Sequence, residues 1–191
     1  MAKLKRSNDR KVTNAVTKSG NVAIANTFGL PAGKEYSCPS ATATCSTVCY
    51  AGKLEKLYKG VKAQLLHNWE LLKDADFDTM VSLLNEMIVD FNKDCDKRNA
   101  PKLFRIHWDG DFFNDTYTYA WKKVIEGHED VQFWVYTRVK SAAIILKGIS
   151  NLSLYYSTDD DNAETGAELK TEHNIRLAYL GKTFSATESK M

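Results

Sequence analysis

Apolar residues along the chain follow two different spacings, one typical of helices and one typical of strands. Spacings of three and four residues run through positions 54–72 and 77–91, so both segments are predicted to be helical. Short apolar runs that suit strands lie at residues 21–30, 103–108, 131–136, 152–156 and 175–180. Shorter helical patterns separate the last four runs, so the sequence predicts strands that alternate with helices.

Strands that alternate with helices indicate a parallel sheet, because parallel neighbours need a crossover connection. We therefore expect an α/β fold, a partial (β/α) TIM-type barrel with about five to six parallel strands. The 191 residues form a single domain in this prediction. Residues 1–20 are expected to be either a frayed end or a segment that adds a strand to the sheet.

Composition and charge narrow the class of protein. The net charge of +2 is too small to favour nucleic-acid binding, so no nucleic-acid partner is expected. No apolar run is long enough to span a bilayer and no signal peptide is recognised, so we expect no membrane partner and a cytoplasmic location. Thiols in the cytoplasm stay reduced and remain available for metals.

Three of the four cysteines lie in one short segment directly after the first predicted strand. Cys38, Cys45 and Cys49 are separated by six and three residues, and thiolates this close together suit a soft metal centre. Structural zinc normally uses two pairs of closely spaced ligands. Three cysteines from one loop instead favour an iron–sulfur cluster, with 4Fe–4S as the expected type. A zinc site and unliganded or redox-active thiols are the alternatives.

Two further residues are candidates for a fourth cluster ligand. Cys95 ends the second predicted helix, at the end of the fold opposite the cysteine loop, so a free thiol is the favoured interpretation. His107 lies near the carboxyl end of a strand, on the same side as the cysteines. It either ligates iron or forms hydrogen bonds in a polar interior.

Polar residues gather where one of the predicted strands ends. A period of two places Arg105, His107 and Asp109 on one face of that strand. A buried parallel strand normally carries apolar residues there, so this face suggests a functional mouth. Asp109 and Asp111 are two residues apart and form either an acid–base pair or helix caps.

Two later strands also lead into polar residues. Tyr136 and Arg138 lie at the end of one strand, and Arg138 is placed to neutralise an anionic cluster or a substrate carboxylate. The acidic residues at 159–161 follow another strand. They recruit a hard cation or, as the favoured interpretation, form a solvated loop or helix cap.

The cysteine segment, residues 105–112 and residues 136–138 together resemble a bacteriophage family, the gene-product-eighty-eight-like proteins. The resemblance covers residues 21–157 and includes residues 27–33 as a further motif. Members of this family look like relatives of the radical S-adenosylmethionine (SAM) enzymes. A phage-encoded protein is expected in the cytoplasm of the host cell.

The resemblance implies a cofactor set. In radical SAM enzymes three cysteines hold a 4Fe–4S cluster, and the fourth iron binds the amino and carboxylate groups of SAM. By this likeness the three cysteines bind the cluster, Gly110 with Asp111 receives the SAM amino group, and Ser157 contacts the ribose. The cofactor-binding residues expected around the cluster are His107, Asp109, Gly110, Asp111, Tyr136, Arg138 and Ser157.

The cysteine spacing departs from the usual radical SAM pattern, so two functions stay open. In the first, the chain is an iron–sulfur protein of radical SAM-like type that cleaves SAM reductively, with a reductase or a small-molecule substrate as partner. In the second, the protein ligates the cluster, or a zinc ion, completely. The chain is then a non-enzymatic electron-transfer or structural module.

Overall fold

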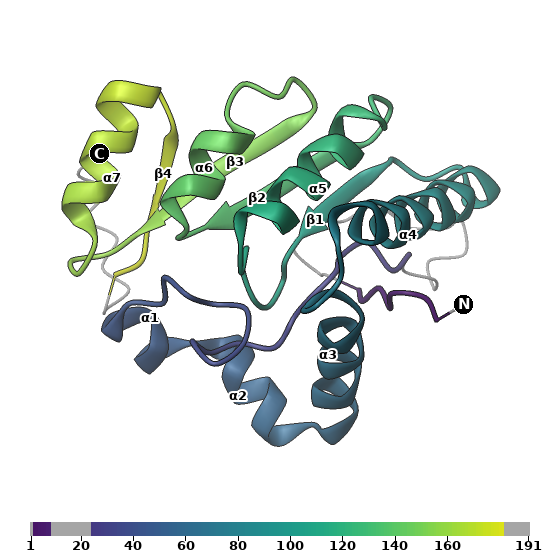
Figure 1. The fold of residues 1–191 in the computed structure, drawn as a ribbon, viewed down its shortest axis with the longest axis horizontal. Helices are drawn as coiled ribbons and strands as arrows, with labels where there is room; N and C mark the ends of the chain where they lie inside the picture. The colour runs from purple at the N-terminus through teal and green to yellow at the C-terminus, as the bar shows by residue number, and fades with distance from the viewer. Residues whose placement is uncertain (1, 9–23, 182–191) are drawn as a thin grey trace.

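The computed structural model describes residues 2–8 and 24–181, which form an α/β fold around a four-stranded parallel sheet (Figure 1). The strands are β1 (Leu103–Ile106), β2 (Gln132–Thr137), β3 (Leu152–Thr158) and β4 (Arg176–Tyr179), in that order across the sheet. The helices are α1 (Ala43–Val48), α2 (Tyr50–Leu57), α3 (Lys59–Leu72), α4 (Phe77–Arg98), α5 (Asp115–Glu126), α6 (Lys140–Leu146) and α7 (Ala163–His173). Each pair of neighbouring strands is joined by one crossover helix, which makes the pairs parallel.

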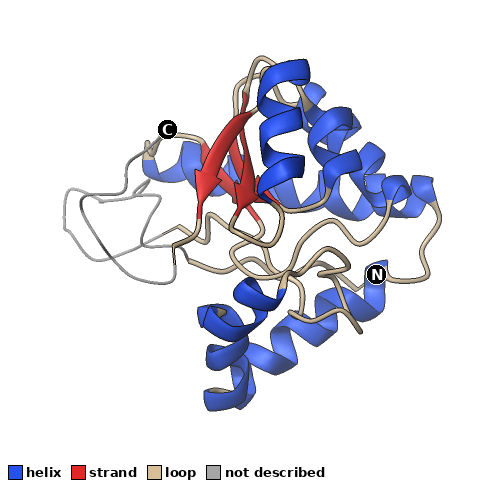
Figure 2. Ribbon diagram, turned by 90° about the vertical axis from the view of Figure 1, so that its left-hand side faces the viewer, coloured by secondary structure: helices blue, strands red, loops and turns tan. Residues whose placement is uncertain are grey.

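Helices α4 to α6 form a layer over one face of the sheet (Figure 2), and α7 continues that layer beside α6. Side chains alternate between the faces of a strand, and β3 accordingly alternates between buried and half-buried residues. On the face of the sheet that the helices cover, Phe104 of β1 and Phe133 of β2 pack with Trp121 of α5 in the hydrophobic core. On the other face, the Arg105 guanidinium lies 5.1 Å from the centre of the Trp134 ring.

The segment before the cysteines runs alongside β1 as an additional, irregular strand. Thr27 forms a parallel bridge with Arg105, and the Trp108 N–H donates to the Phe28 carbonyl at 2.9 Å. Ser7 pairs with Thr27 from the other side in the antiparallel direction. Residues 24–30 therefore occupy the place predicted for a first strand, although residues 21–23 lie outside the described part. Residues 9–20 of the predicted N-terminal segment also lie outside it.

The sheet is not the partial barrel that the sequence predicted. The four later strands are confirmed within two residues of their predicted bounds. The predicted first strand contributes only isolated bridges, so the regular sheet has four strands rather than five or six. Among the described residues no strand pairs with the outer edge of β4, and the sheet stays open.

The predicted helix at 54–72 is divided into α2 and α3. Tyr58 adopts an extended conformation, with φ −121° and ψ 101°, and interrupts the helix for one residue. Apolar spacing continues across this break, which is why periodicity alone did not reveal it. A further short helix, α1, forms inside the cysteine segment. None of the described helices is long and apolar enough to cross a membrane.

Candidate functional site

One cavity at the carboxyl edge of the sheet brings together all ten residues that the sequence predicted for the site. The cysteine segment forms one wall, and the chain at the ends of β1, β2 and β3 forms the other. The cavity measures about 180 Å³. Its lining includes Cys38, Cys45, Cys49, His107, Asp109, Gly110, Asp111, Tyr136, Arg138 and Ser157.

Cys49 is the N-cap residue of α2. Its Sγ accepts a hydrogen bond from the Gly52 backbone N–H at 3.3 Å, as a serine or aspartate oxygen does at other N-caps. The helix dipole and the unpaired N–H groups at this end favour a thiolate. The helical segment predicted from position 54 begins earlier, at Tyr50, which places Cys49 at its N-terminus.

The surroundings of Cys38 favour the neutral thiol. Burial raises the pKa of its thiol to about 12, and the nearby Asp111 carboxylate raises it further. A hydrogen bond with the Gly33 backbone lowers this pKa but does not offset burial. Deprotonation of Cys38 at neutral pH therefore requires a positive partner, such as a metal.

Gly110 allows the loop after β1 to approach the cysteine segment closely. Its φ is +81°, and a Cβ at this position would lie 2.4 Å from Ser37 Oγ and 2.8 Å from the Leu30 carbonyl oxygen. No other residue type fits both this conformation and this space. Gly110 therefore fixes the distance between the loop after β1 and Cys38.

Arg138 connects Cys45 to the loop that follows β3. Arg138 Nη1 donates to Asp159 Oδ2 at 2.7 Å, and both side chains are buried. The same oxygen accepts a hydrogen bond from Thr42 Oγ1 at 2.7 Å. Thr42 in turn caps α1, because its Oγ1 accepts the Cys45 N–H at 3.0 Å. A series of polar contacts thus runs from the end of β2 to α1, the helix that contains Cys45.

Burial and a nearby positive charge act in opposite directions on the pKa of the Cys45 thiol. Burial raises its pKa, and the Arg138 guanidinium lowers it through its charge and a hydrogen bond. The Asp161 carboxylate accepts the Thr44 backbone N–H at 2.9 Å, next to Cys45. Asp159 and Asp161 therefore hold the N-terminus of α1, which matches the helix-cap interpretation of residues 159–161.

Asp111 is held by hydrogen bonds from the protein itself. Its Oδ1 accepts from the Phe112 N–H at 2.8 Å and from Thr137 Oγ1 at 2.6 Å, and its Oδ2 accepts from the Arg138 N–H at 2.8 Å. Burial raises the pKa of Asp111 to about 6, and these hydrogen bonds oppose the rise. Asp111 therefore positions Arg138 by tying the loop after β1 to the end of β2.

His107 does not share a face with Arg105 as predicted. Its φ of +59° ends the strand alternation after Ile106. The ring instead packs against Phe112 and Tyr117, while Arg105 stacks on the opposite face. A left-handed histidine is uncommon, and such strained residues cluster at functional sites.

One of the two ring nitrogens of the His107 imidazole has a hydrogen-bond partner, and its surroundings favour the neutral ring. Its Nε2 lies 2.9 Å from the Tyr117 hydroxyl, whereas Nδ1 is buried and has no hydrogen-bond partner in the described part of the chain. Burial lowers the pKa of His107 to about 3, and the Arg105 charge adds to this effect. Nδ1 is therefore a neutral nitrogen whose binding capacity is unused.

Asp109 and Glu55 form a carboxyl pair that the sequence did not indicate. Asp109 Oδ1 accepts the Gly110 N–H at 2.8 Å, and Glu55 Oε1 accepts the Ala32 N–H at 2.8 Å. Burial raises the pKa of Asp109, and the nearby Glu55 side chain raises it further, so the neutral form of Asp109 is favoured. Of the two interpretations of Asp109 and Asp111, binding of backbone N–H groups agrees with the structure, because Asp109 accepts the Gly110 N–H and Asp111 accepts the Phe112 and Arg138 N–H groups. No spacing rule links position 55 to position 109.

Tyr136 and Ser157 complete the cavity wall, and Cys95 lies outside it. The Tyr136 ring contacts the Trp134 ring, with centroids 5.2 Å apart. Cys95 packs within the hydrophobic core, where its Sγ lies 3.7 Å from the Pro101 carbonyl oxygen. Its position agrees with the free-thiol interpretation.

Comparison with known proteins gives the chain a family. A family model described as "Gene product 88" matches residues 2–191. The chain belongs to the gene product 88 family. It is similar to the "Gene 88 protein" of Mycobacterium phage D29, with 60% identity over 191 residues that cover 97% of this chain and 79% of the relative. It is also similar to the "Gene 88 protein" of Mycobacterium phage L5, with 59% identity and coverage of 97% and 80%.

Membership of the gene product 88 family confirms the bacteriophage resemblance. The names of these relatives state no activity, and no solved structure matches the chain. The likeness to radical SAM enzymes therefore stays a prediction.

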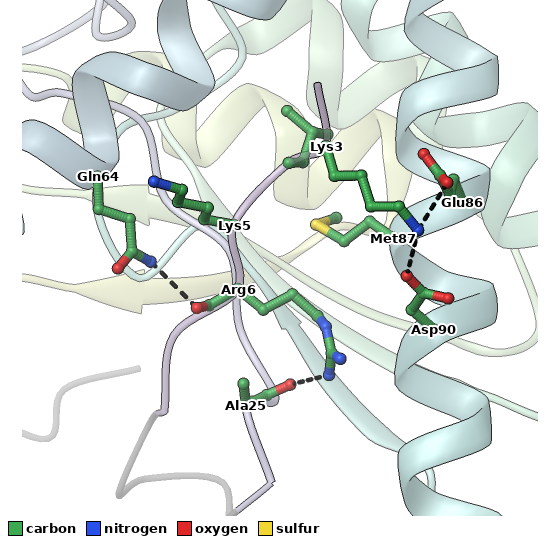
Figure 3. Close-up of a pocket in the computed structure, with 9 residues that line it drawn as sticks. Lys3, Lys5, Arg6, Ala25, Gln64, Glu86, Met87 and Asp90 are labelled. Carbon is green, nitrogen blue, oxygen red and sulfur yellow. Dashed lines mark hydrogen bonds and ion pairs between the residues drawn. The ribbon is translucent and has the colours of Figure 1, made fainter. Parts of the chain in front are cut away.

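A second cavity in this gene product 88 fold, of about 330 Å³, lies beside residues 3–6 (Figure 3). Two of its cationic side chains, Lys3 and Arg6, have partners in the surrounding protein. Lys3 Nζ lies 2.8 Å from Glu86 and 3.1 Å from Asp90, and Arg6 Nη1 donates to the Ala25 carbonyl at 2.6 Å. These contacts anchor the N-terminal segment on α4, so the cavity at the sheet edge remains the better candidate site.

Proposed function

We propose that this gene product 88 family member binds an iron–sulfur cluster through Cys38, Cys45 and Cys49. The observation that carries the proposal is that all three thiols line one cavity at the carboxyl edge of the sheet. Ligands of α/β folds gather at this edge. When bound, such a cluster supplies one-electron transfer.

The origin of the three thiols is the reason to favour a cluster over a zinc ion. Cys38, Cys45 and Cys49 come from one segment, whereas structural zinc normally uses two pairs of closely spaced ligands. Among the described residues, no group of three or more His, Cys, Asp or Glu side chains is arranged to hold a metal ion. Metal and sulfide analysis therefore decides between the cluster and zinc.

The surroundings of the thiols also support a negatively charged group. The Gly52 N–H contacts Cys49, and the Arg138 guanidinium lowers the pKa of Cys45. Because burial raises the pKa of Cys38 and of Cys45, cluster binding must release protons. Loading is therefore expected to be faster at pH 8.5 than at pH 6.5, which are trial values around the ordinary thiol range.

Anaerobic reconstitution followed by iron and sulfide analysis tests the proposal. We expect about four irons and about four sulfides per chain. The substitutions Cys38→Ser, Cys45→Ser and Cys49→Ser should each abolish stable loading, whereas the matched control Cys95→Ser should keep it. Zinc without sulfide, or equal loss in the Cys95→Ser control, would overturn the proposal.

Two versions of the function differ in the fourth ligand. In one, SAM occupies the fourth iron, as the radical SAM likeness implies. In the other, His107 Nδ1 closes the site and the chain transfers electrons or is stabilised by the cluster. The unpartnered Nδ1 and the neutral imidazole support the second version.

Electron paramagnetic resonance separates the two versions. If SAM binds the cluster, adding SAM changes the spectrum of the reduced cluster, and His107→Asn leaves the spectrum without SAM unchanged. If His107 is the ligand, SAM has no effect and His107→Asn shifts the spectrum. Asparagine is the suitable replacement because it tolerates the left-handed conformation.

A further inference from the structure

The surface next to the cysteine cavity carries an unusual set of exposed side chains on α2 and α3. Six large hydrophobic side chains are exposed in the described part of the chain, and four of them, Val48, Tyr50, Leu57 and Tyr58, fall within eleven residues. Leu57 and Tyr58 are 72% and 57% exposed. Clustered exposed apolar residues mark interaction sites more often than scattered ones do.

Four lysines surround these apolar side chains. Lys53, Lys56, Lys59 and Lys62 are all exposed, and no acidic side chain in the described residues lies within ion-pair distance of any of them. Glu55 is the single acidic residue between positions 43 and 69, and its carboxylate contacts the Ala32 N–H and Asp109. The surface is therefore both apolar and strongly positive.

The geometry of α2 and α3 brings the lysines close to the exposed apolar side chains. Tyr50, Lys53 and Leu57 are three and four residues apart and share one face of α2. Lys59 and Lys62 lie in the first turn of α3, where the helix dipole disfavours cations. Tyr58, the N-cap of α3, makes no side-chain hydrogen bond to that turn. An external carboxylate would satisfy both the lysines and the free N–H groups.

We propose that this surface is the docking site for an acidic electron-transfer protein. We call it the α2–α3 patch, and it consists of Val48, Tyr50, Lys53, Lys56, Leu57, Tyr58, Lys59 and Lys62. Cys49 caps the helix that carries the patch, so a protein bound there lies beside the thiol cavity. Charge complementarity selects a carboxylate-rich partner, and exposed Leu57 and Tyr58 supply the apolar centre of a small transient interface. The choice of an electron-transfer partner rests on the proposed function.

Binding of the metal-free chain to a flavodoxin, used as an acidic probe, tests the patch separately from cluster loading. We expect binding at 50 mM NaCl that weakens about tenfold or more at 200 mM NaCl, because exposed charges are screened. The triple variant Lys53→Gln, Lys56→Gln, Lys59→Gln should weaken binding at least about tenfold. A triple control with the same net charge, Lys93→Gln, Lys97→Gln, Lys170→Gln, should change it less than about twofold.

The apolar part of the patch has its own control. Leu57→Ser should weaken binding about fivefold or more, and Tyr119→Ser, at an exposed tyrosine on α5, should leave it unchanged. Absence of binding, or equal weakening in the control variants, would overturn the proposal. Lysine-dependent binding to phosphatidylserine vesicles without binding to flavodoxin would also overturn it, because the patch would then recognise lipid.

Discussion

Arg138 and Asp159 form a buried ion pair, with Nη1 and Oδ2 separated by 2.7 Å, and Arg138 also lines the cysteine cavity. Asp159 also accepts the Thr42 hydroxyl, so the pair links the end of β2 to the cap of α1. Removing one member of a buried pair leaves the other charge without compensation. The arrangement therefore makes the position of Cys45 depend on residues far along the chain.

Arg138→Gln is expected to lower the free energy of unfolding by about 3–5 kcal/mol, because it strands the Asp159 carboxylate. Arg138→Gln with Asp159→Asn should cost less than the two single changes combined. The exposed pair of Lys140 with Glu168 provides the control, and Lys140→Gln should cost less than about 1 kcal/mol. Urea unfolding measures all four, and equal losses for Arg138→Gln and Lys140→Gln would contradict the buried pair.

Gly110→Ala is expected to cost at least about 3 kcal/mol, because the added Cβ meets Ser37 and the Leu30 carbonyl in addition to the strain of a positive φ. Gly148→Ala is the matched control. Gly148 has a similar φ of +79° but open space around it, so only the conformational cost of about 1 kcal/mol applies. Thermal unfolding should show the difference, and similar melting temperatures for the two variants would refute the close approach.

Tyr117→Phe is expected to lower the free energy of unfolding by about 1–3 kcal/mol, since it removes the partner of His107 Nε2 inside the core. Tyr119 lies on the same helix and is 51% exposed. Tyr119→Phe should therefore stay within about 0.5 kcal/mol of the parent. A neutral effect of Tyr117→Phe in chemical denaturation would show that the hydroxyl does not support the imidazole.

Asp109→Asn is expected to stabilise the protein increasingly as pH rises above about 4. Burial and the Glu55 charge raise the pKa of Asp109 in the folded protein above its ordinary value of 3.8. The folded state therefore binds this proton more tightly than the unfolded state, and stability is lost as pH rises through the raised pKa. The asparagine in the variant does not titrate, so the variant does not lose this stability as pH rises.

Unfolding at pH 4, 6 and 8 checks this expectation, with a gain of about 1–3 kcal/mol at pH 8 and almost none at pH 4. Asp74→Asn, at an exposed aspartate, should show no trend beyond about 0.5 kcal/mol. A gain from Asp109→Asn that is equal at all three pH values would exclude a raised pKa of Asp109 in the folded protein.

The sequence predicted the parallel sheet and the cavity because both depend on local signals. Parallel pairing follows from alternating strands and helices, and the residues that follow parallel strands meet at one edge of the sheet. Cys38 and Arg138 were therefore placed together correctly although 100 residues separate them.

The features that the sequence did not predict correctly depend on the backbone angles of single residues and on contacts between residues distant in sequence. One left-handed residue, His107, reverses the direction of its ring, and periodicity assumes that no such residue occurs. Tyr58 divides a helix in the same way. The Asp109–Glu55 pair joins a loop to a helix turn, and neither carboxylate carries a local sign of the other.

The contacts between Thr42 and Asp159, and between Thr44 and Asp161, each span 117 residues. During synthesis α1 with Cys45 leaves the ribosome long before the two aspartates that hold this helix in place. The nascent chain therefore lacks the two carboxylates that anchor α1, the helix of Cys45, until β3 and the loop after it have emerged. Ordering of the thiol cavity is accordingly a late event in the folding of each new molecule.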